Sequence, residues 1–317
     1  MISFRYHIVS IVSVFLALAV GVALGGGPLK GEVDNTLVEQ VQSDRKTKAD
    51  LQSQIAALRS GNTFVDGFAA NVAPGLLSKG LENRPVTLVV LPGADERAVS
   101  SLTELVGTAG GSVAGTLRAG EGLLDAGNKQ LVDELGSQLL DGTPDVTVED
   151  DASGYERMGA LIARAVATDE DGGADVDDAA NSILSGLSTA NLMSAEGELT
   201  RRGSLVLFVA GPGSGSDDQR QGANTIVTAL ALAIDADTDG VVVGGPMEAA
   251  RDNGLIGSLR GNVAAAEDVS TVDALDRQAG QVVAVMALSE QATGEAGHYG
   301  AVDAADGAMP GASAPTE

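Results

Sequence analysis

One glycine-rich loop has the residue types and spacing to bind an anion. It reads Gly211-Pro-Gly-Ser-Gly-Ser216 and stands between an apolar run and a helical pattern. Its three glycines are Gly211, Gly213 and Gly215. Such a loop exposes backbone N–H groups at the start of a helix, where phosphate groups bind. However, no lysine follows as in a P-loop, the spacing differs from G-x-G-x-x-G, and Asp217 and Asp218 add negative charge. We therefore favour a helix cap without a ligand.

A second pair of glycines, Gly244 and Gly245, precedes Pro246 after the next apolar run. In an open parallel sheet, both loops would lie at the carboxyl ends of the strands, where crevices bind ligands. All these glycines are therefore candidates for a cofactor-binding crevice. A tight turn explains Gly244 and Gly245 equally well, and the sequence identifies no cofactor.

Groups for acid–base or nucleophilic catalysis are scarce. His298 is the only histidine beyond His7, and no nucleophile-elbow motif accompanies it. A catalytic serine needs a base within reach, and the sequence supplies no second candidate. A packed or surface histidine is the favoured interpretation. We expect no catalytic residues and a non-enzymatic protein.

Metal ligands are also scarce. The chain contains no cysteine, which excludes thiolate sites and disulfides. One acidic run alternates with glycine, and its aspartates include Asp169, Asp171, Asp175 and Asp177. The run fails as an EF-hand, because the position of the final acidic ligand is Ala180. The methionines are isolated, so no copper-binding spacing is present, and we expect no metal site.

The elements that position these loops alternate between strands and helices. Short apolar runs at 86–91, 112–117, 204–210 and 240–244 predict buried strands, and Asp95 is placed to cap a helix. We expect an α/β domain over 85–300, Rossmann-like with a mostly parallel sheet, and with a helical, acidic insertion at about 118–202. Further helices are expected at 247–259 and 281–291, with a short run near Val263. Residues 301–317 are predicted to form a disordered tail.

A coiled-coil stalk is predicted for residues 28–62, followed by a helical bridge at 63–84 that docks the stalk through Phe64, Phe68 and Val72. The apolar residues assigned to its seam are Leu37, Val41, Leu51, Ile55 and Leu58. They fit a heptad seam in which Asp44 and Lys48 take the two middle core positions. We expect this seam to join chains into a homo-oligomer and Gly61-Asn62 to end the helix. An amphipathic helix folded back on its own domain is the alternative.

Residues 1–27 predict a transmembrane anchor. The run from Ile8 to Leu24 carries no charge and is long enough to cross a bilayer. Arg5 in the preceding segment places the N-terminus in the cytoplasm and the bulk of the chain outside it. The alternative is a cleaved secretory signal, since Ala17-Leu-Ala19 has the small-x-small form that a signal peptidase accepts. The apolar run continues beyond Ala19, so we favour the retained anchor.

The charge balance excludes nucleic acid as a main partner. Asp and Glu number 44 against 19 Lys and Arg, which gives a net charge of -25. Such a surface is repelled by the phosphate backbone and by anionic lipid headgroups.

Two stretches of the chain resemble a known family. The first is Met1-Ile-Ser-Phe-Arg-Tyr-His7 followed by the apolar segment 14–25. The second lies near the other end and comprises Val269, Ser270, Thr271, Val272, Asp273, Gly297, His298, Tyr299 and Gly300. Together they resemble the actinobacterial copper transport protein B family, and the order of the parts agrees along nearly the whole chain.

The resemblance implies a protein of the cell envelope with a role in copper homeostasis or efflux, described in mycobacteria as an outer-membrane channel-like factor. Members in corynebacteria act in cell separation, which implies an interaction scaffold with an envelope protein partner as the alternative. The family supplies no catalytic residues. A single apolar helix cannot form a pore alone, because a channel needs several spans or a closed barrel.

Overall fold

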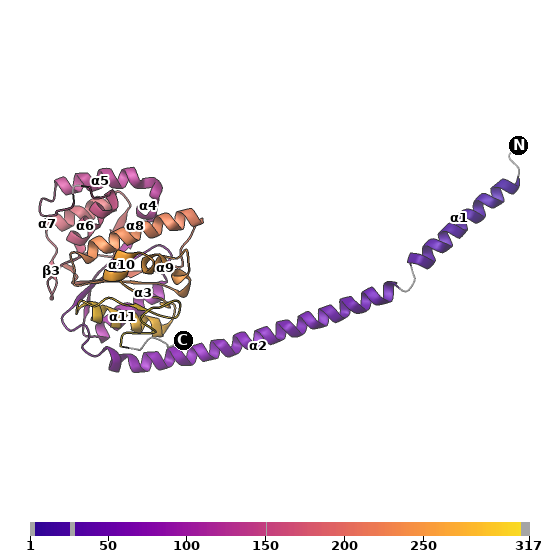
Figure 1. The fold of residues 1–317 in the computed structure, drawn as a ribbon, viewed down its shortest axis with the longest axis horizontal. Coiled ribbons are helices and arrows are strands. Elements are labelled where there is room, and N and C mark those ends of the chain that lie inside the picture. The colour runs from indigo at the N-terminus through magenta and orange to yellow at the C-terminus, as the bar shows by residue number, and fades with distance from the viewer. Residues whose placement is uncertain (1–3, 26–28, 150, 312–317) are drawn as a thin grey trace. The chain divides into compact units, whose positions relative to one another are not determined.

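The computed structural model describes residues 4–25, 29–149 and 151–311, with the side chains of 29–37 outside that description. The chain divides into two compact units, Met1–Phe64 and Val65–Glu317. Figure 1 labels their helices and the strand β3.

The first unit begins with the apolar helix α1, Phe4–Gly25 (Figure 1). All of its side chains are exposed in the isolated chain. Among the described residues, α1 is the one helix that is long and apolar enough to cross a membrane, with a mean hydropathy of 2.6. The predicted N-terminal apolar helix is confirmed.

Helix α2 is longer than the sequence predicts and spans Leu29–Leu77. The expected end at Gly61-Asn62 is wrong. A glycine inside a helix costs only about 1 kcal/mol relative to alanine, which many turns of helix on both sides overcome. The hydroxyl of Thr63 also donates to the carbonyl of Arg59 at 2.9 Å, across the glycine.

The end of α2 docks through a face that does not include its phenylalanines. Ala69, Ala73 and Leu77 are buried, whereas Phe64 and Phe68 are exposed. Helical spacing allows two candidate faces here, and the face that carries Ala69 and Ala73 is the buried one. Within the same unit, Asp66 Oδ2 accepts from Arg277 Nη2 at 2.8 Å.

The second unit is built on a seven-stranded sheet in the order β4-β2-β1-β6-β7-β8-β9. The mutually parallel strands are β1 Pro85–Val90, β2 Ser112–Ala119, β6 Leu205–Val209, β7 Val241–Gly244, β8 Ser270–Val272 and β9 His298–Tyr299. The short edge strand β4, Met193–Ala195, runs antiparallel to β2. The predicted mostly parallel α/β sheet is confirmed. A separate small sheet pairs β3, Ala174–Asp175, with β5, Arg201–Arg202.

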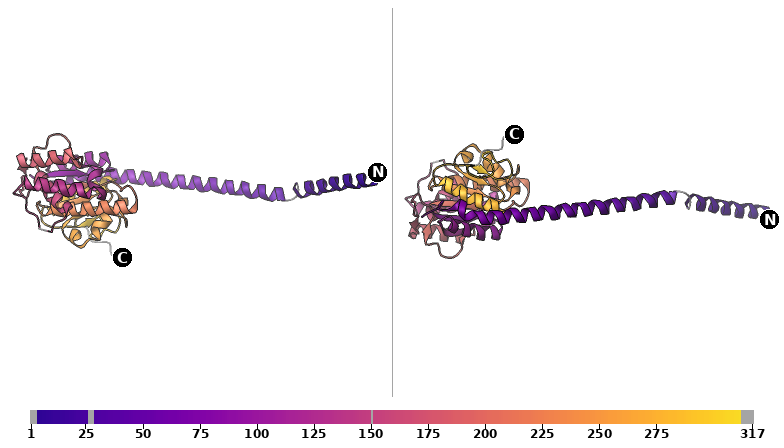
Figure 2. Two further views of the ribbon diagram at one scale, coloured as in Figure 1. Left: turned by 90° about the horizontal axis from the view of Figure 1, so that it is seen from above. Right: turned by 90° about the horizontal axis from the view of Figure 1, so that it is seen from below.

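Helices cover both faces of the large sheet (Figures 1 and 2). On one face lie α3 Glu96–Thr108, α11 Gln278–Gln291 and the end of α2. On the other face lie α5 Lys129–Asp141, α6 Gly154–Val166, α7 Asp178–Thr189, α8 Asp217–Asp235, α9 Leu255–Arg260 and α10 Val263–Asp268. The strands alternate between the two cores: Leu88 and Leu207 pack on the first face, and Val89 and Phe208 on the second.

The predicted helix at 247–259 is interrupted. A 3-10 turn covers Met247–Ala250, and α9 begins only at Leu255. The chain bends so tightly that a Cβ on Gly254 would overlap the carbonyl of Ala249. The short run near Val263 forms the helix α10.

The region 118–202 is mostly helical, as predicted. Besides α5, α6 and α7 it contains the single-turn helix α4, Glu121–Leu124, and a 3-10 turn at Ala126–Asn128. Its acidic run is more ordered than a solvated loop. Asp177 accepts from the N–H of Ala180 at 2.8 Å at the start of α7 and pairs with Arg164 at 2.6 Å. These contacts lower the pKa of Asp177 to about 2, with the Arg164 hydrogen bond as the main cause.

The tail is shorter than the sequence predicts. Residues 301–311 form turns against the domain, where Val302 packs on Ile256 and Asp306 Oδ2 accepts from the N–H of His298 at 2.8 Å. A composition rich in Ala, Gly, Pro and Asp misleads here, because a buried carboxylate, Asp273, accepts from the backbone N–H of Ala301. The remainder of the predicted tail, 312–317, lies outside the described residues.

Candidate functional site

The sheet contains a crevice at the point where strand order reverses. After β1 the chain adds β2 on one side and later β6 on the other, so the loops that leave β1 and β6 diverge. Ligands of open α/β sheets bind at such a switch point, beyond the carboxyl ends of the strands. Two hollows flank it here, with volumes of about 360 Å³ and about 650 Å³.

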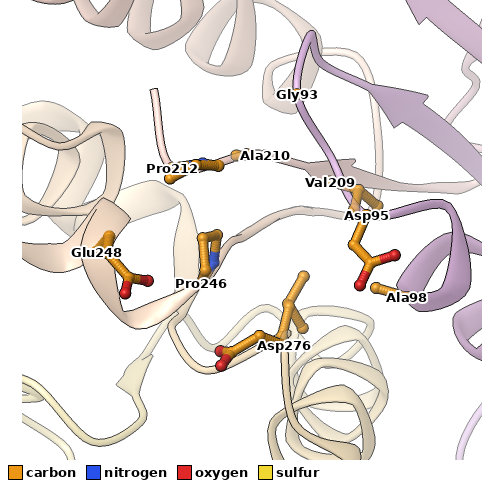
Figure 3. A pocket seen from close by; sticks show the side chains of 11 residues that line it. Gly93, Asp95, Ala98, Val209, Ala210, Pro212, Pro246, Glu248 and Asp276 are labelled. Carbon is orange, nitrogen blue, oxygen red and sulfur yellow. The ribbon is translucent and has the colours of Figure 1, made fainter. Parts of the chain in front are cut away.

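The smaller hollow has an apolar floor and an acidic rim. Asp95, Glu248 and Asp276 reach it from the loops that follow β1, β7 and β8, as Figure 3 shows. Val209 and Leu275 belong to the floor. The lining includes no Lys, Arg or His, so the hollow disfavours anions. Across the described residues, no three His, Cys, Asp or Glu side chains gather closely enough to hold a metal ion.

The larger hollow includes the glycine-rich loop. Gly211, Gly213 and Gly215 all line it. A Cβ on Gly211 would overlap the backbone of Gly93, so this glycine permits the loops after β1 and β6 to touch. Gly213 and Gly215 have φ of +82° and +87°, a conformation that favours glycine.

The start of α8 satisfies its own backbone groups. Ser216 Oγ accepts from the N–H of Gln219 at 3.3 Å, and Gln219 Oε1 accepts from the N–H of Ser216 at 2.9 Å. This is a capping box. Arg220 donates to the carbonyl of Gly215 at 3.1 Å and pairs with Asp217. Arg220, the one cationic side chain in this lining, is thus bonded to neighbouring groups. The glycine-rich loop ends in a helix cap.

Gly244 and Gly245 line neither hollow. A Cβ on Gly244 would lie 2.5 Å from Leu275 Cδ1, and one on Gly245 would lie 3.1 Å from Ala249 Cβ. Both are therefore needed for close packing under the loops. Of the expected crevice glycines, the structure brings only those of the β6–α8 loop to the crevice.

The two C-terminal motif segments meet as neighbouring strands. Val269–Asp273 contains β8 and Gly297–Gly300 contains β9, with Thr271 opposite His298 and Val272 opposite Tyr299. These short strands lie at the edge of the sheet opposite β4. The residues of the C-terminal stretch that resembles the family thus form one structural unit.

Arg260, at the end of α9, organises this unit. Its guanidinium donates to Thr271 Oγ1 at 2.9 Å, to the carbonyl of Tyr299 at 2.8 Å and to the carbonyl of Val302 at 2.5 Å, and it pairs with Asp273. Sequence reasoning missed it. The available signal was an arginine at the end of a short apolar segment, which is also common on surfaces.

Asp273 is fully buried, and both of its carboxylate oxygens accept hydrogen bonds. Its carboxylate accepts from the N–H of Ala301 at 2.6 Å, from the N–H of Val302 at 3.1 Å and from Arg260 at 3.3 Å. A buried carboxylate is tolerated only when it is paired and hydrogen-bonded in this way. Gly300 is required beside it, because a Cβ there would overlap the Asp273 carboxylate.

The hydrogen bonds assign the tautomer of His298. His298 Nε2 lies 3.2 Å from the carbonyl of Ala266, which can only accept, so the proton of the neutral ring lies on Nε2. Nδ1 then accepts from the Thr271 hydroxyl at 2.9 Å, while Thr271 Oγ1 accepts from Arg260 Nε. Burial lowers the pKa of His298, and the charge of Arg260 lowers it further. Both ring nitrogens are engaged in structural contacts.

The remaining motif residues are also bound to neighbours. Ser270 Oγ accepts from the N–H of Gly297 and from Gln291 Nε2, each at 3.0 Å. Tyr299 donates its hydroxyl to Glu290, and burial raises the pKa of Tyr299. The unit therefore closes the sheet edge through a buried polar network.

Comparisons with known proteins identify a family and several relatives that match nearly the whole chain. The model of the family described as "Copper transport outer membrane protein, MctB" matches residues 1–310. Proteins named "Copper transporter MctB" from Mycobacterium bovis and Mycobacterium tuberculosis are each 26% identical over 309 residues, covering 95% of this chain and 96% of theirs. The Mycobacterium leprae protein of that name is 24% identical over 315 residues, with 95% and 96% covered. The resemblance drawn from the two ends of the sequence is confirmed, and the chain belongs to the MctB family of copper transport outer membrane proteins.

Proposed function

We propose that this chain is a membrane-anchored protein of the cell envelope that acts in copper transport as a non-enzymatic component. The family match and the names of the relatives support the copper role and the association with a membrane. In this proposal α1 is retained as a single span, with its N-terminal end in the cytoplasm and the α/β domain outside it.

Helix α1 is the observation that carries the proposal. Its apolar side chains are uniformly exposed, with none turned into a protein core, which suits a helix surrounded by lipid. One helix satisfies its own backbone hydrogen bonds in a bilayer but encloses no channel. We therefore assign the chain an accessory role, in which it holds a folded domain at the membrane and acts through a partner.

The chemistry of the domain supports the non-enzymatic part of the proposal. His298, the one histidine of the domain, is buried and uses both ring nitrogens in structural hydrogen bonds. The crevice at the strand ends carries carboxylates but presents no base beside a nucleophile among its described lining residues. Copper is proposed as the cargo of the system rather than as a resident cofactor.

An interaction scaffold for cell separation or envelope remodelling is the second candidate function. Apolar side chains on the first unit's part of α2 favour it: Val41, Leu51, Ile55 and Leu58 are all exposed in the single chain. We propose that this stalk joins two or more copies and presents their domains to an envelope protein partner. Leu37 continues the seam in sequence, although its side chain lies outside the described part of the helix.

Deletion of the gene tests the copper role. We expect the deletion strain to accumulate copper and to stop growing at a lower copper concentration than its parent. The full-length gene should restore both values, while the cellular zinc content stays constant as the control. Copper content and copper tolerance that equal those of the parent would contradict the proposal.

A stalk variant separates the two candidate functions. Replacing Val41, Leu51 and Ile55 with serine should abolish self-association, because it removes the apolar side chains of the seam. The scaffold function predicts chained or unseparated cells for this variant with normal copper content. Normal cell separation together with raised copper would remove the scaffold function and retain the copper role.

A further inference from the structure

The exposed stripe on α2 is interrupted by two opposite charges. Val41, Leu51 and Ile55 are 46%, 52% and 47% exposed, and the exposed residues Asp44 and Lys48 occupy the seam positions between Val41 and Leu51. An ion pair within one helix could join these two charges, since they are four residues apart. Such a pair would leave the apolar side chains uncovered, so the stripe still requires an occupant.

The order of seam residues is symmetric about Lys46. Leu37 and Ile55 lie at equal distances on either side of it, and so do Val41 and Leu51, and Asp44 and Lys48. A second copy that runs antiparallel, with the two Lys46 positions level, therefore places each apolar residue opposite an apolar residue. It also places Asp44 of each copy opposite Lys48 of the other, which makes two ion pairs at the centre.

A parallel pair in register lacks this complementarity. In that arrangement each seam residue faces its own copy, so Asp44 meets Asp44 and Lys48 meets Lys48. Like charges brought together in a partly desolvated seam repel one another. The parallel pair would thus place two repulsive layers in the middle of its contact.

Other antiparallel registers also fail. Moving one copy by a heptad places Lys48 opposite Leu51 and Asp44 opposite Ile55, so each charge loses its partner against an apolar side chain. The register centred on Lys46 is the one that matches every seam position from 37 to 55. Leu58 lies beyond it, where it would face Asp34.

We propose that α2 pairs with α2 of a second copy of this chain, antiparallel and centred on Lys46. The inference rests on the self-association proposed above and is independent of the copper role. The paired segment, residues 37–55, is about 27 Å long. Arg45 of the two copies would border the seam at its centre, where water and salt screen their repulsion.

This pairing has a consequence for the attached segments. Because α1 precedes the seam in both chains, the two membrane helices leave the pair at opposite ends.

Cysteine cross-linking of the full chain in detergent tests the orientation, since the natural sequence contains no cysteine. We expect a mixture of the V41C and L51C variants to form a disulfide-linked dimer, and neither variant alone to do so. In the antiparallel pair the two Val41 positions are about 15 Å apart along the axis. A disulfide needs Cα atoms within about 7 Å.

The matched control uses E39C with S53C. These positions are also equidistant from Lys46 but lie on the outer face of the seam, so the mixture should remain unlinked. Self-linking of V41C or of L51C in a sample of dimeric mass would overturn the antiparallel register while leaving self-association intact. A monomeric mass with no linking in any sample would overturn both this inference and the proposed self-association.

Charge reversal gives a second readout. D44K and K48D should each weaken the dimer by about tenfold or more, because each replaces two attractive contacts with repulsive ones. The double variant D44K/K48D should regain the original dissociation constant. A double variant that stays as weak as either single variant would overturn the proposed pairing of Asp44 with Lys48.

Discussion

Arg260 Nη1 lies 3.3 Å from the carboxylate oxygen Oδ2 of Asp273, so the end of α9 is tied to the end of β8. The Arg260 side chain is 10% exposed and the Asp273 side chain is fully buried. The same arginine reaches β9 and the residues beyond it. The ion pair ties α9 to the first C-terminal motif segment, and the other hydrogen bonds of Arg260 tie α9 to the second.

Removal of Arg260 should destabilise the domain strongly. We expect R260A to lower the free energy of unfolding by about 3–5 kcal/mol, because it leaves the buried Asp273 carboxylate without its counter-charge. R260K should lose less, since lysine keeps the charge but not the planar fork of donors. Thermal unfolding of the full chain measures both.

The matched control for Arg260 is R251A, which removes an exposed arginine from the neighbouring turn. Its effect should stay within about 0.5 kcal/mol. An R260A variant as stable as R251A would contradict the role of Arg260 in closing the sheet.

Gly300 should tolerate no side chain. G300A combines a φ of +138° with overlap between the new Cβ and the Asp273 carboxylate. G294A is the matched control, because Gly294 has a φ of +82° but no neighbouring atom within 4 Å of the position that a Cβ would take. We expect about 1 kcal/mol of destabilisation for G294A from backbone strain, and at least twice that for G300A. If denaturant titrations gave G300A and G294A equal losses of unfolding free energy, the predicted overlap between the new Cβ and the Asp273 carboxylate would be contradicted.

Asp235 should make the protein less stable as the pH rises. Burial and the nearby charge of Asp268 raise the pKa of Asp235 to about 6, against 3.8 for the ordinary carboxyl. Between these values the folded state keeps a proton that the unfolded state has lost, so stability decreases as the pH increases from about 4 to 6.

D235N removes this titration and keeps an oxygen to accept from the N–H of Val241. We expect it to stabilise the chain by up to about 2 kcal/mol at pH 7 and by little at pH 4. Denaturant titrations at the two pH values measure the difference. A gain of the same size at both pH values would point to a cause other than ionisation.

Much of the domain could be predicted from its sequence. Apolar runs such as 86–91 and 204–210 carry no alternation of polar residues, which is the pattern of strands covered on both faces, and the structure places them in the middle of the sheet. Asp95 is recognisable as a helix cap, and its side chain accepts from a backbone N–H two residues later. These signals are local, so a single sequence contains them.

Other features depend on contacts that no local pattern encodes. Phe64 and Phe68 have the spacing of a docking face, yet the alanines on another face of α2 are the ones buried. Arg260 and Asp273 are isolated charges in the sequence and become partners only when α9 meets the end of β8. Gly244 is expected in the crevice but instead allows close packing against Leu275, which comes from a distant loop.

Cellular copper content in a deletion strain that carries matched anchor variants tests the proposed function most directly. The variant L16K/V20K places two charges in the middle of α1, each opposed by about 2.5–3.5 kcal/mol in a bilayer, and L16A/V20A keeps the segment apolar. At equal protein levels, the wild-type chain and L16A/V20A should return copper to the parent's value, while L16K/V20K should leave it raised. Restoration by L16K/V20K, or no change of copper on deletion, would contradict a membrane-anchored role in copper transport.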